Sequence, residues 1–120
     1  MAATQSPRIR LLHIRDEING VTSALQGSTY ESYHASYTLR RTAERAVQII
    51  SEAARALPAD LIAKHSAAPW SAIIGNVLRH EYQSIDDRRM WDIVTVHLPP
   101  LRDVVLQMLA DLDGDNGMSG

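Results

Sequence analysis

The chain contains no cysteine, so disulfides, thiolate metal sites and cysteine nucleophiles are all excluded. Lysine is nearly missing as well, because Lys64 is the only one among twelve basic residues and the others are arginine. Arginine suits bidentate phosphate binding, although a GC-rich coding sequence would explain its abundance equally well. With a formal net charge of −2, we expect no broad nucleic-acid-binding surface and at most a local cluster.

Long apolar runs are also lacking. No stretch approaches the roughly 20 apolar residues that a membrane span needs, and residues 1–7 have no apolar signal region. The chain of 120 residues, 45% hydrophobic and 22% charged, is of ordinary globular composition and one domain in length. We therefore expect a cytoplasmic protein that does not bind membranes.

What the chain does have is helical periodicity. Apolar residues recur every three or four positions over residues 8–25, which predicts a helix that Gly27 ends. A second long helix is expected over residues 33–57, stopped by Pro58. The connection between them has room for one helical turn capped by Ser28 or Thr29. Further helices are expected over residues 58–65, from Pro69, over residues 86–97, and from Pro99 to Leu112.

No segment alternates long enough to require a strand, and no repeat is visible. The predicted fold is all-α, an antiparallel bundle of four to five helices. Residues 1–112 are expected to form a single domain, followed by a disordered tail over residues 113–120. His13, His34, His65 and His97 have no ligand-like spacing with one another, so no metal site is expected.

An unusual run of polar side chains occupies residues 75–82, GNVLRHEY. On a helix Asn76 and His80 share a face, and Arg79 lies on an adjacent line. These residue types suit metal-free RNA cleavage, in which an imidazole moves protons, a guanidinium offsets phosphate charge and an amide positions the phosphate. A twofold dimer would bring in a second histidine. Alternatively, His80 caps a helix and Tyr82 packs at the surface.

The run IIGNVLRHEY resembles the HepT-like proteins of the HEPN superfamily, toxins of toxin–antitoxin pairs. The similarity also includes Pro69-Trp70 before it, WDIV and LPPL after it, and RLLHI and ERAVQIISEAA nearer the N-terminus, so it extends over about residues 8–108. It implies an all-helical homodimer with metal-independent endoribonuclease activity and no cofactor. It also implies RNA as substrate and a minimal nucleotidyltransferase of the MNT type as antitoxin.

The family motif is R-x-x-x-x-H-x-Y, with a polar residue after the arginine. By this resemblance His80 is the catalytic histidine, Asn76 the polar residue, and Tyr82 the residue to which the antitoxin transfers AMP. The family's arginine is Gly75 here. Either another arginine, Arg79, Arg41 or Arg45, supplies the missing charge, or the chain is a weak or inactive HEPN module that acts as a binding partner or nucleotidylation substrate.

Several aromatic and charged residues outside the motif have simpler interpretations. Tyr30, Tyr33 and Tyr37 recur at helical spacing and could stack on bases, but packing is the favoured interpretation. Trp70 and Trp91 are expected to anchor the core. The acids of the run at residues 86–89 suit a helix start, although the run could also face the partner.

Overall fold

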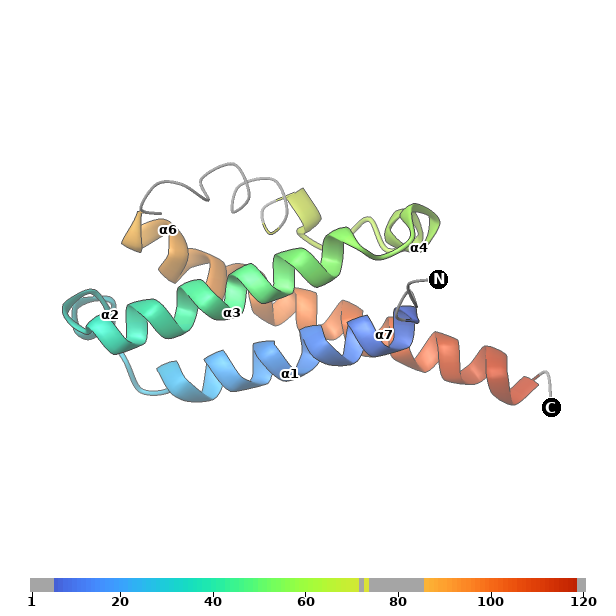
Figure 1. The fold of residues 1–120 in the computed structure, drawn as a ribbon, viewed down its shortest axis with the longest axis horizontal. Coiled ribbons are helices and arrows are strands. Elements are labelled where there is room, and N and C mark those ends of the chain that lie inside the picture. The colour runs from blue at the N-terminus through green and yellow to red at the C-terminus, as the bar shows by residue number, and fades with distance from the viewer. Residues whose placement is uncertain (1–5, 72, 74–85, 119–120) are drawn as a thin grey trace, which may run out of the picture.

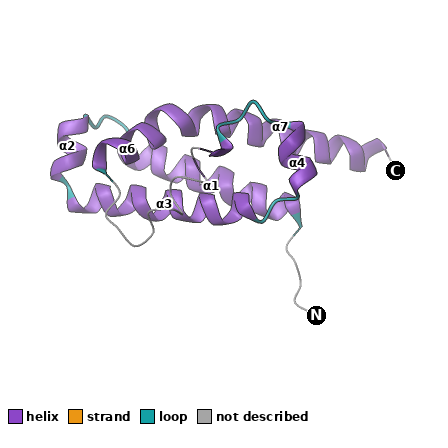
Figure 2. Cartoon of the chain, turned by 90° about the horizontal axis from the view of Figure 1, so that it is seen from above, coloured by secondary structure: helices purple, strands orange, loops and turns teal. Residues whose placement is uncertain are grey.

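The computed structural model describes residues 6–71, 73 and 86–118, and in these residues every regular element is helical and none is a strand. The all-α prediction is therefore confirmed for the described chain. Two long helices, α1 and α3, pack side by side, and α7 packs against α1 (Figure 1). Short helices α2 and α4 lie toward opposite ends of the molecule (Figure 2). The elements are α1 (Pro7–Leu25), α2 (Tyr30–Ala35), α3 (Tyr37–Arg55), α4 (Ala59–Lys64), α6 (Asp87–Asp92), the π-helix η1 (Ile93–His97) and α7 (Leu98–Met118).

The predicted ends of the first helix and the predicted turn after it are confirmed. Gly27 follows α1 with a φ of 81°, a left-handed conformation that only glycine adopts without a steric penalty. Thr29 then caps α2, accepting from the Ser32 amide at 3.1 Å while the Ser32 hydroxyl accepts from the Thr29 amide at 2.9 Å.

The prediction of one helix over residues 33–57 is wrong at its start. Ser36 interrupts it, because its hydroxyl accepts from the Leu39 amide at 3.1 Å and so begins a new helix, α3. The chain bends there, and α2 packs separately against α3 and α6. A serine within a helical pattern can cap a new helix instead of continuing the old one, and the periodicity of apolar residues does not show which occurs.

The predicted break before Pro99 does not occur, since α6, η1 and α7 follow one another without a gap. Prolines at 99 and 100 cannot donate to the carbonyls four residues earlier. The turn just before them is π-helical, and the Leu98 amide donates to the carbonyl of Ile93, five residues back. This wider turn makes room for the proline rings and keeps the helix continuous.

The helix α7 continues to Met118, whereas the sequence predicted a disordered tail from Asp113. Beyond Leu112, Asp113 forms an ion pair with Arg8 of α1.

By length and composition the segment Asp87–Gly114 could cross a membrane. Several of its apolar residues instead belong to the core, in which Leu98, Leu101, Val105 and Met108 have no solvent exposure.

The core lies where α1, α3 and α7 meet, with contributions from α2, α6 and η1. The predicted inner stripe of α1 is confirmed, since all five of its residues are buried. Trp70 is buried as predicted and its indole donates to the His65 carbonyl at 2.9 Å, while Trp91 packs against the core partly buried. Burying the α1 stripe, Leu11, Ile14, Ile18, Val21 and Leu25, stabilises the fold by about 2 kcal/mol per side chain.

Candidate functional site

The sequence motif of residues 75–82 lies outside the described residues. The roles of Asn76, Arg79, His80 and Tyr82 therefore remain predictions from the sequence. The nearest described residues on either side of the motif are Ile73 and Asp86, and they define where the chain enters and leaves this stretch.

At the entrance, the Ser51 hydroxyl donates a hydrogen bond of 2.7 Å to the carbonyl oxygen of Ile73. Both residues are fully buried, and among the described residues Ser51 is the only buried one that is not hydrophobic or aromatic. A buried hydroxyl needs such a partner, so this contact fixes the chain, two residues before Gly75, against the C-terminal part of α3. Sequence reasoning missed the role of Ser51, although a serine beside the apolar Ile50 and Ala54 was the available signal.

At the exit, Asp86 caps α6 by accepting from the amides of Arg88 at 2.7 Å and Arg89 at 3.3 Å. The prediction of an acidic helix start here is confirmed. Asp87 then meets His34 of α2, with 2.8 Å between the carboxylate oxygen and Nδ1. The chain that leaves the motif is thereby joined to the α2 end of the molecule.

An aromatic cluster strengthens this α2–α6 contact. The ring centroids of Tyr33 and Trp91 lie 5.3 Å apart and those of Tyr30 and Trp91 6.2 Å, with Arg88 4.8 Å above the Tyr30 ring. Packing is therefore confirmed for Tyr30 and Tyr33. The prediction that Tyr37 also packs in the interior is wrong, because its side chain is 65% exposed.

The hydroxyl of Tyr33 is buried without a hydrogen-bond partner among the described residues. Burial raises the pKa of Tyr33 well above its ordinary value, and the negative charges of Asp87 and Glu44 raise it further. Because burial disfavours the phenolate, this side chain stays neutral and serves packing.

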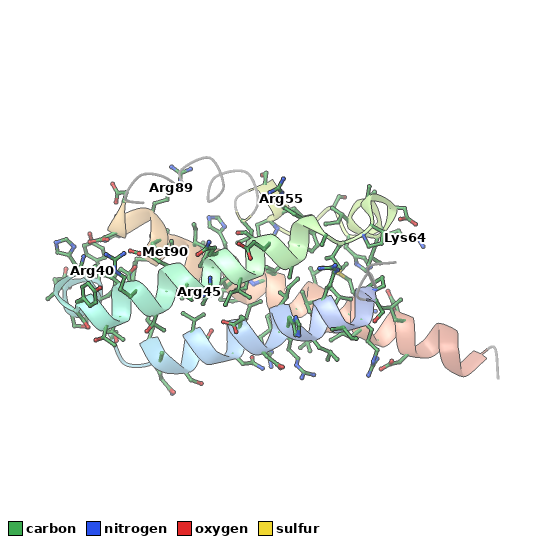
Figure 3. The ribbon with its side chains drawn as sticks, in the orientation of Figure 1. Arg40, Arg45, Arg55, Lys64, Arg89 and Met90 are labelled. Carbon is green, nitrogen blue, oxygen red and sulfur yellow. The ribbon has the colours of Figure 1, made fainter. Side chains whose placement is uncertain are left out.

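Two of the predicted phosphate-binding residues, Arg41 and Arg45, lie on the α1 side of α3. Both line a groove between α3 and α1, as do Asp16 and Glu17 of α1. Figure 3 shows Arg45 on α3. Arg41 donates to Glu44 at 2.8 Å and covers the Tyr37 ring at 5.0 Å. Hydrogen bonding to Tyr37 and then to Glu44 raises the pKa of Arg41, so it remains charged at every working pH.

A second set of arginines lies on the face of α3 that carries Ser51. Arg40 lies three helical turns before Ser51, and the two residues differ by only about 20° in direction around the helix axis. Arg55 lies about one turn after Ser51. Arg40 is half-buried, and its positive charge acts on Tyr33 beside the α6 start. Its Nε is buried without a hydrogen-bond partner among the described residues. The sequence did not single out Arg40 or Arg55 as candidates, yet they share the face of α3 to which the entrance of the motif is fixed.

The described side chains show no group of three His, Asp or Glu residues close enough to hold a metal ion. The family model of the HepT-like ribonucleases matches residues 14–108. The chain belongs to this family. The match extends from α1 into α7 and includes the motif, both of its anchored ends and all the α3 arginines. The predicted resemblance is thus confirmed.

Curated relatives of this HepT-like chain carry names of the same kind. "Putative RNase TTE0752" from Caldanaerobacter subterraneus subsp. tengcongensis is 32% identical over 107 residues, 88% of this chain and 96% of the relative. "Putative RNase MJ1380" from Methanocaldococcus jannaschii is 30% identical over 97 residues, 79% of this chain and 89% of the relative. "Gamma-glutamylcyclotransferase and putative RNase MJ0434" from the same archaeon is 27% identical over 108 residues, 88% of this chain and 49% of the relative. No solved structure gives a significant match.

Proposed function

We propose that this HepT-like chain is the toxin of a type II toxin–antitoxin pair, a metal-independent endoribonuclease that acts as a homodimer. The observation that carries the proposal is the family match over residues 14–108, which includes the histidine motif. His80 exchanges the protons of the ribose 2′-hydroxyl and the leaving oxygen, and Asn76 positions the phosphate. A twofold assembly provides two histidines.

The positive charge that Gly75 cannot supply comes from another arginine. Arg79 is adjacent to His80 in sequence, and Arg41 and Arg45 were the predicted alternatives on α3. Arg40 joins them as a candidate, because it lies on the Ser51 face of α3 and near the start of α6. Loss of one such electrostatic stabiliser typically costs about 10²–10³ in rate, so a replacement is required for strong activity.

The antitoxin is a minimal nucleotidyltransferase that transfers AMP from ATP to Tyr82. The tyrosine oxygen attacks the α-phosphorus, the bond to pyrophosphate breaks, and the phenolic proton passes to solvent. The added phosphodiester places a bulky anion two residues from His80, where it repels an incoming RNA phosphate. This modification turns the ribonuclease off.

The proposal is tested by expressing the chain without its antitoxin. Wild type is expected to arrest growth and cleave RNA, whereas His80→Ala loses both effects because no imidazole remains to move the proton. His97→Ala is the matched control, since His97 lies outside the motif, at the end of η1. If wild type and His80→Ala are equally harmless, the chain is instead the inactive module that the loss of the motif arginine at Gly75 allows.

The antitoxin half of the proposal is tested by incubating the purified chain with ATP and a minimal nucleotidyltransferase encoded beside its gene. Intact-mass spectrometry is expected to show added AMP on wild type and none on Tyr82→Phe. Tyr37→Phe is the matched control, because Tyr37 is a well exposed tyrosine outside the motif. Equal labelling of wild type and Tyr82→Phe would place the modification elsewhere.

A further inference from the structure

Two exposed arginines, Arg55 and Arg89, lie at the two ends of the motif segment, residues 74–85. Arg55 follows Ser51 on α3 by about one helical turn, and Ser51 holds the chain at Ile73, where it enters this segment. Arg89 belongs to α6, the helix that follows the segment. In the view of Figure 3 both arginines lie on the side of α3 opposite α1. They therefore bracket the motif on one side of the molecule.

Most of the length of α3 separates the two arginines. Asp87, at the start of α6, lies 2.8 Å from His34 of α2, the short helix that precedes α3. Arg89 is therefore near the N-terminal end of α3, whereas Arg55 is its last residue. The helix has 19 residues and is about 28 Å long. A strand of several nucleotides fits this span, since successive bases of a stacked strand are about 3.4 Å apart.

The charges around these arginines leave them available to an anion. Neither Arg55 nor Arg89 forms an ion pair with any described residue. Three acids close to them in sequence are already engaged. Asp86 accepts from two backbone amides of α6, Asp87 contacts a histidine of α2, and Glu52 accepts from a glutamine of α3. Positive charge at both ends of the motif segment is thus not neutralised by its described neighbours.

We propose that Arg55 and Arg89 bind two phosphates of the RNA strand, one on each side of the phosphate that is cleaved. A guanidinium can donate two parallel hydrogen bonds to one phosphate, which suits this role. Contacts at both ends of the motif segment hold the strand across it. The two arginines bind the substrate and take no part in proton transfer.

This inference rests on the ribonuclease of the proposed function and names residues that hold its substrate. Binding of uncleaved RNA tests the two arginines, whereas cleavage by wild type tests the ribonuclease. Normal cleavage together with unchanged binding in the arginine variants would overturn only the inference. A wild type that neither binds nor cleaves RNA would overturn both.

The binding test uses the full chain carrying His80→Ala, so that the RNA stays intact, and a fluorescein-labelled single-stranded RNA of about 16 nucleotides and mixed sequence. Adding Arg55→Ala or Arg89→Ala to this parent is expected to weaken binding about five- to tenfold in fluorescence anisotropy at low salt. Each change should also reduce the slope of log affinity against log salt concentration by about 0.7, because one phosphate contact is lost.

Cleavage kinetics of the chain that keeps its motif histidine separate substrate binding from catalysis. Arg55→Ala and Arg89→Ala are expected to raise KM severalfold with much less effect on kcat, the result for a contact made equally in the ground state and the transition state. Arg55→Lys and Arg89→Lys keep the positive charge and should recover most of the affinity. A fall in kcat alone would contradict the proposed role.

Arg15→Ala and Lys64→Ala are the matched controls, because each removes one positive charge from another helix, α1 or α4. Both should bind the RNA as the parent does, and circular dichroism should show every variant folded. Unchanged binding in both Arg55→Ala and Arg89→Ala would overturn the proposal. An equal loss in the two control variants would also overturn it, because net charge would then be the cause.

Discussion

Some residue roles can be predicted from the sequence alone, whereas others depend on contacts that only the structure shows. The motif residues Asn76, His80 and Tyr82 could be proposed from residue type and family pattern alone. The role of Ser51 could not be proposed in this way, because it depends on a hydrogen bond to the carbonyl oxygen of Ile73, 22 positions further along the chain. Likewise, the sequence offered Arg41 and Arg45 as sources of the missing charge, but it did not show that they line a groove with the acids of α1.

Replacing Tyr33 with phenylalanine is expected to change how stability depends on pH. The folded protein holds the pKa of Tyr33 above the value of about 10 found in an unfolded chain. The neutral phenol is therefore favoured by folding, so its contribution to stability is complete below pH 10 and is lost as the pH rises toward the folded pKa. Wild type should lose up to about 1.4 kcal/mol per pH unit above about pH 10 through this group.

Urea unfolding of the two proteins at about pH 7 and about pH 10.5 measures the difference. At neutral pH the Tyr33→Phe variant should match or slightly exceed wild-type stability, since the hydroxyl has no partner among the described residues. At the alkaline pH the variant should be more stable than wild type by a larger margin, since only wild type loses the contribution of the neutral phenol. Tyr37→Phe, at an exposed position, is the control and should follow wild type at both pH values. An equal difference in the free energy of unfolding between Tyr33→Phe and wild type at both pH values would contradict the raised pKa of Tyr33.

At the scale of elements, the pattern of apolar residues predicted where helices exist better than where they end. The start of α1 near Arg8, its end at Gly27, the turn at Thr29 and the start of α6 all agree with the structure, because each depends on a local signal. Two predicted helix boundaries were wrong, because the residue at each of them can have either of two structural roles. Ser36 could continue a helix or cap a new one, and Pro99 could begin a helix or lie within one behind a π-turn.

Replacing Gly27 with alanine is expected to destabilise the fold by about 1 kcal/mol. Its φ of 81° lies in the left-handed region, where a Cβ is penalised even though no neighbour lies within 4 Å. Thermal unfolding measures the loss. Gly20→Ala is the counterpart, because Gly20 is helical in α1 and equally open, and alanine there should add up to about 1 kcal/mol. Equal effects of the two changes would show that conformation is not the cause.

The molecule as a whole is held by contacts between segments distant in sequence, and its C-terminal turns contribute little to them. The apolar side chains of α7 that pack on the core end at Leu112, and beyond it Asp113 forms an exposed ion pair with Arg8. An exposed pair of this kind stabilises a fold by no more than about 1 kcal/mol. The folding unit is therefore expected to be complete at Leu112, although the helix itself continues to Met118.

A chain ending at Leu112 is thus expected to fold with a loss of less than about 1 kcal/mol in the free energy of unfolding. Chemical denaturation compares it with the full chain, and Asp113→Asn in the full chain isolates the ion pair from the loss of helix. Failure of the shortened chain to unfold cooperatively would show that residues 113–118 belong to the core unit.

The buried contact between Ser51 and Ile73 also makes the placement of the motif depend on α3. A substitution in α3 that shifts Ser51 would shift the point at which the chain enters residues 74–85. Related chains with the same motif could therefore differ in catalytic rate, and the cause would then be found on the face of α3 that carries Ser51.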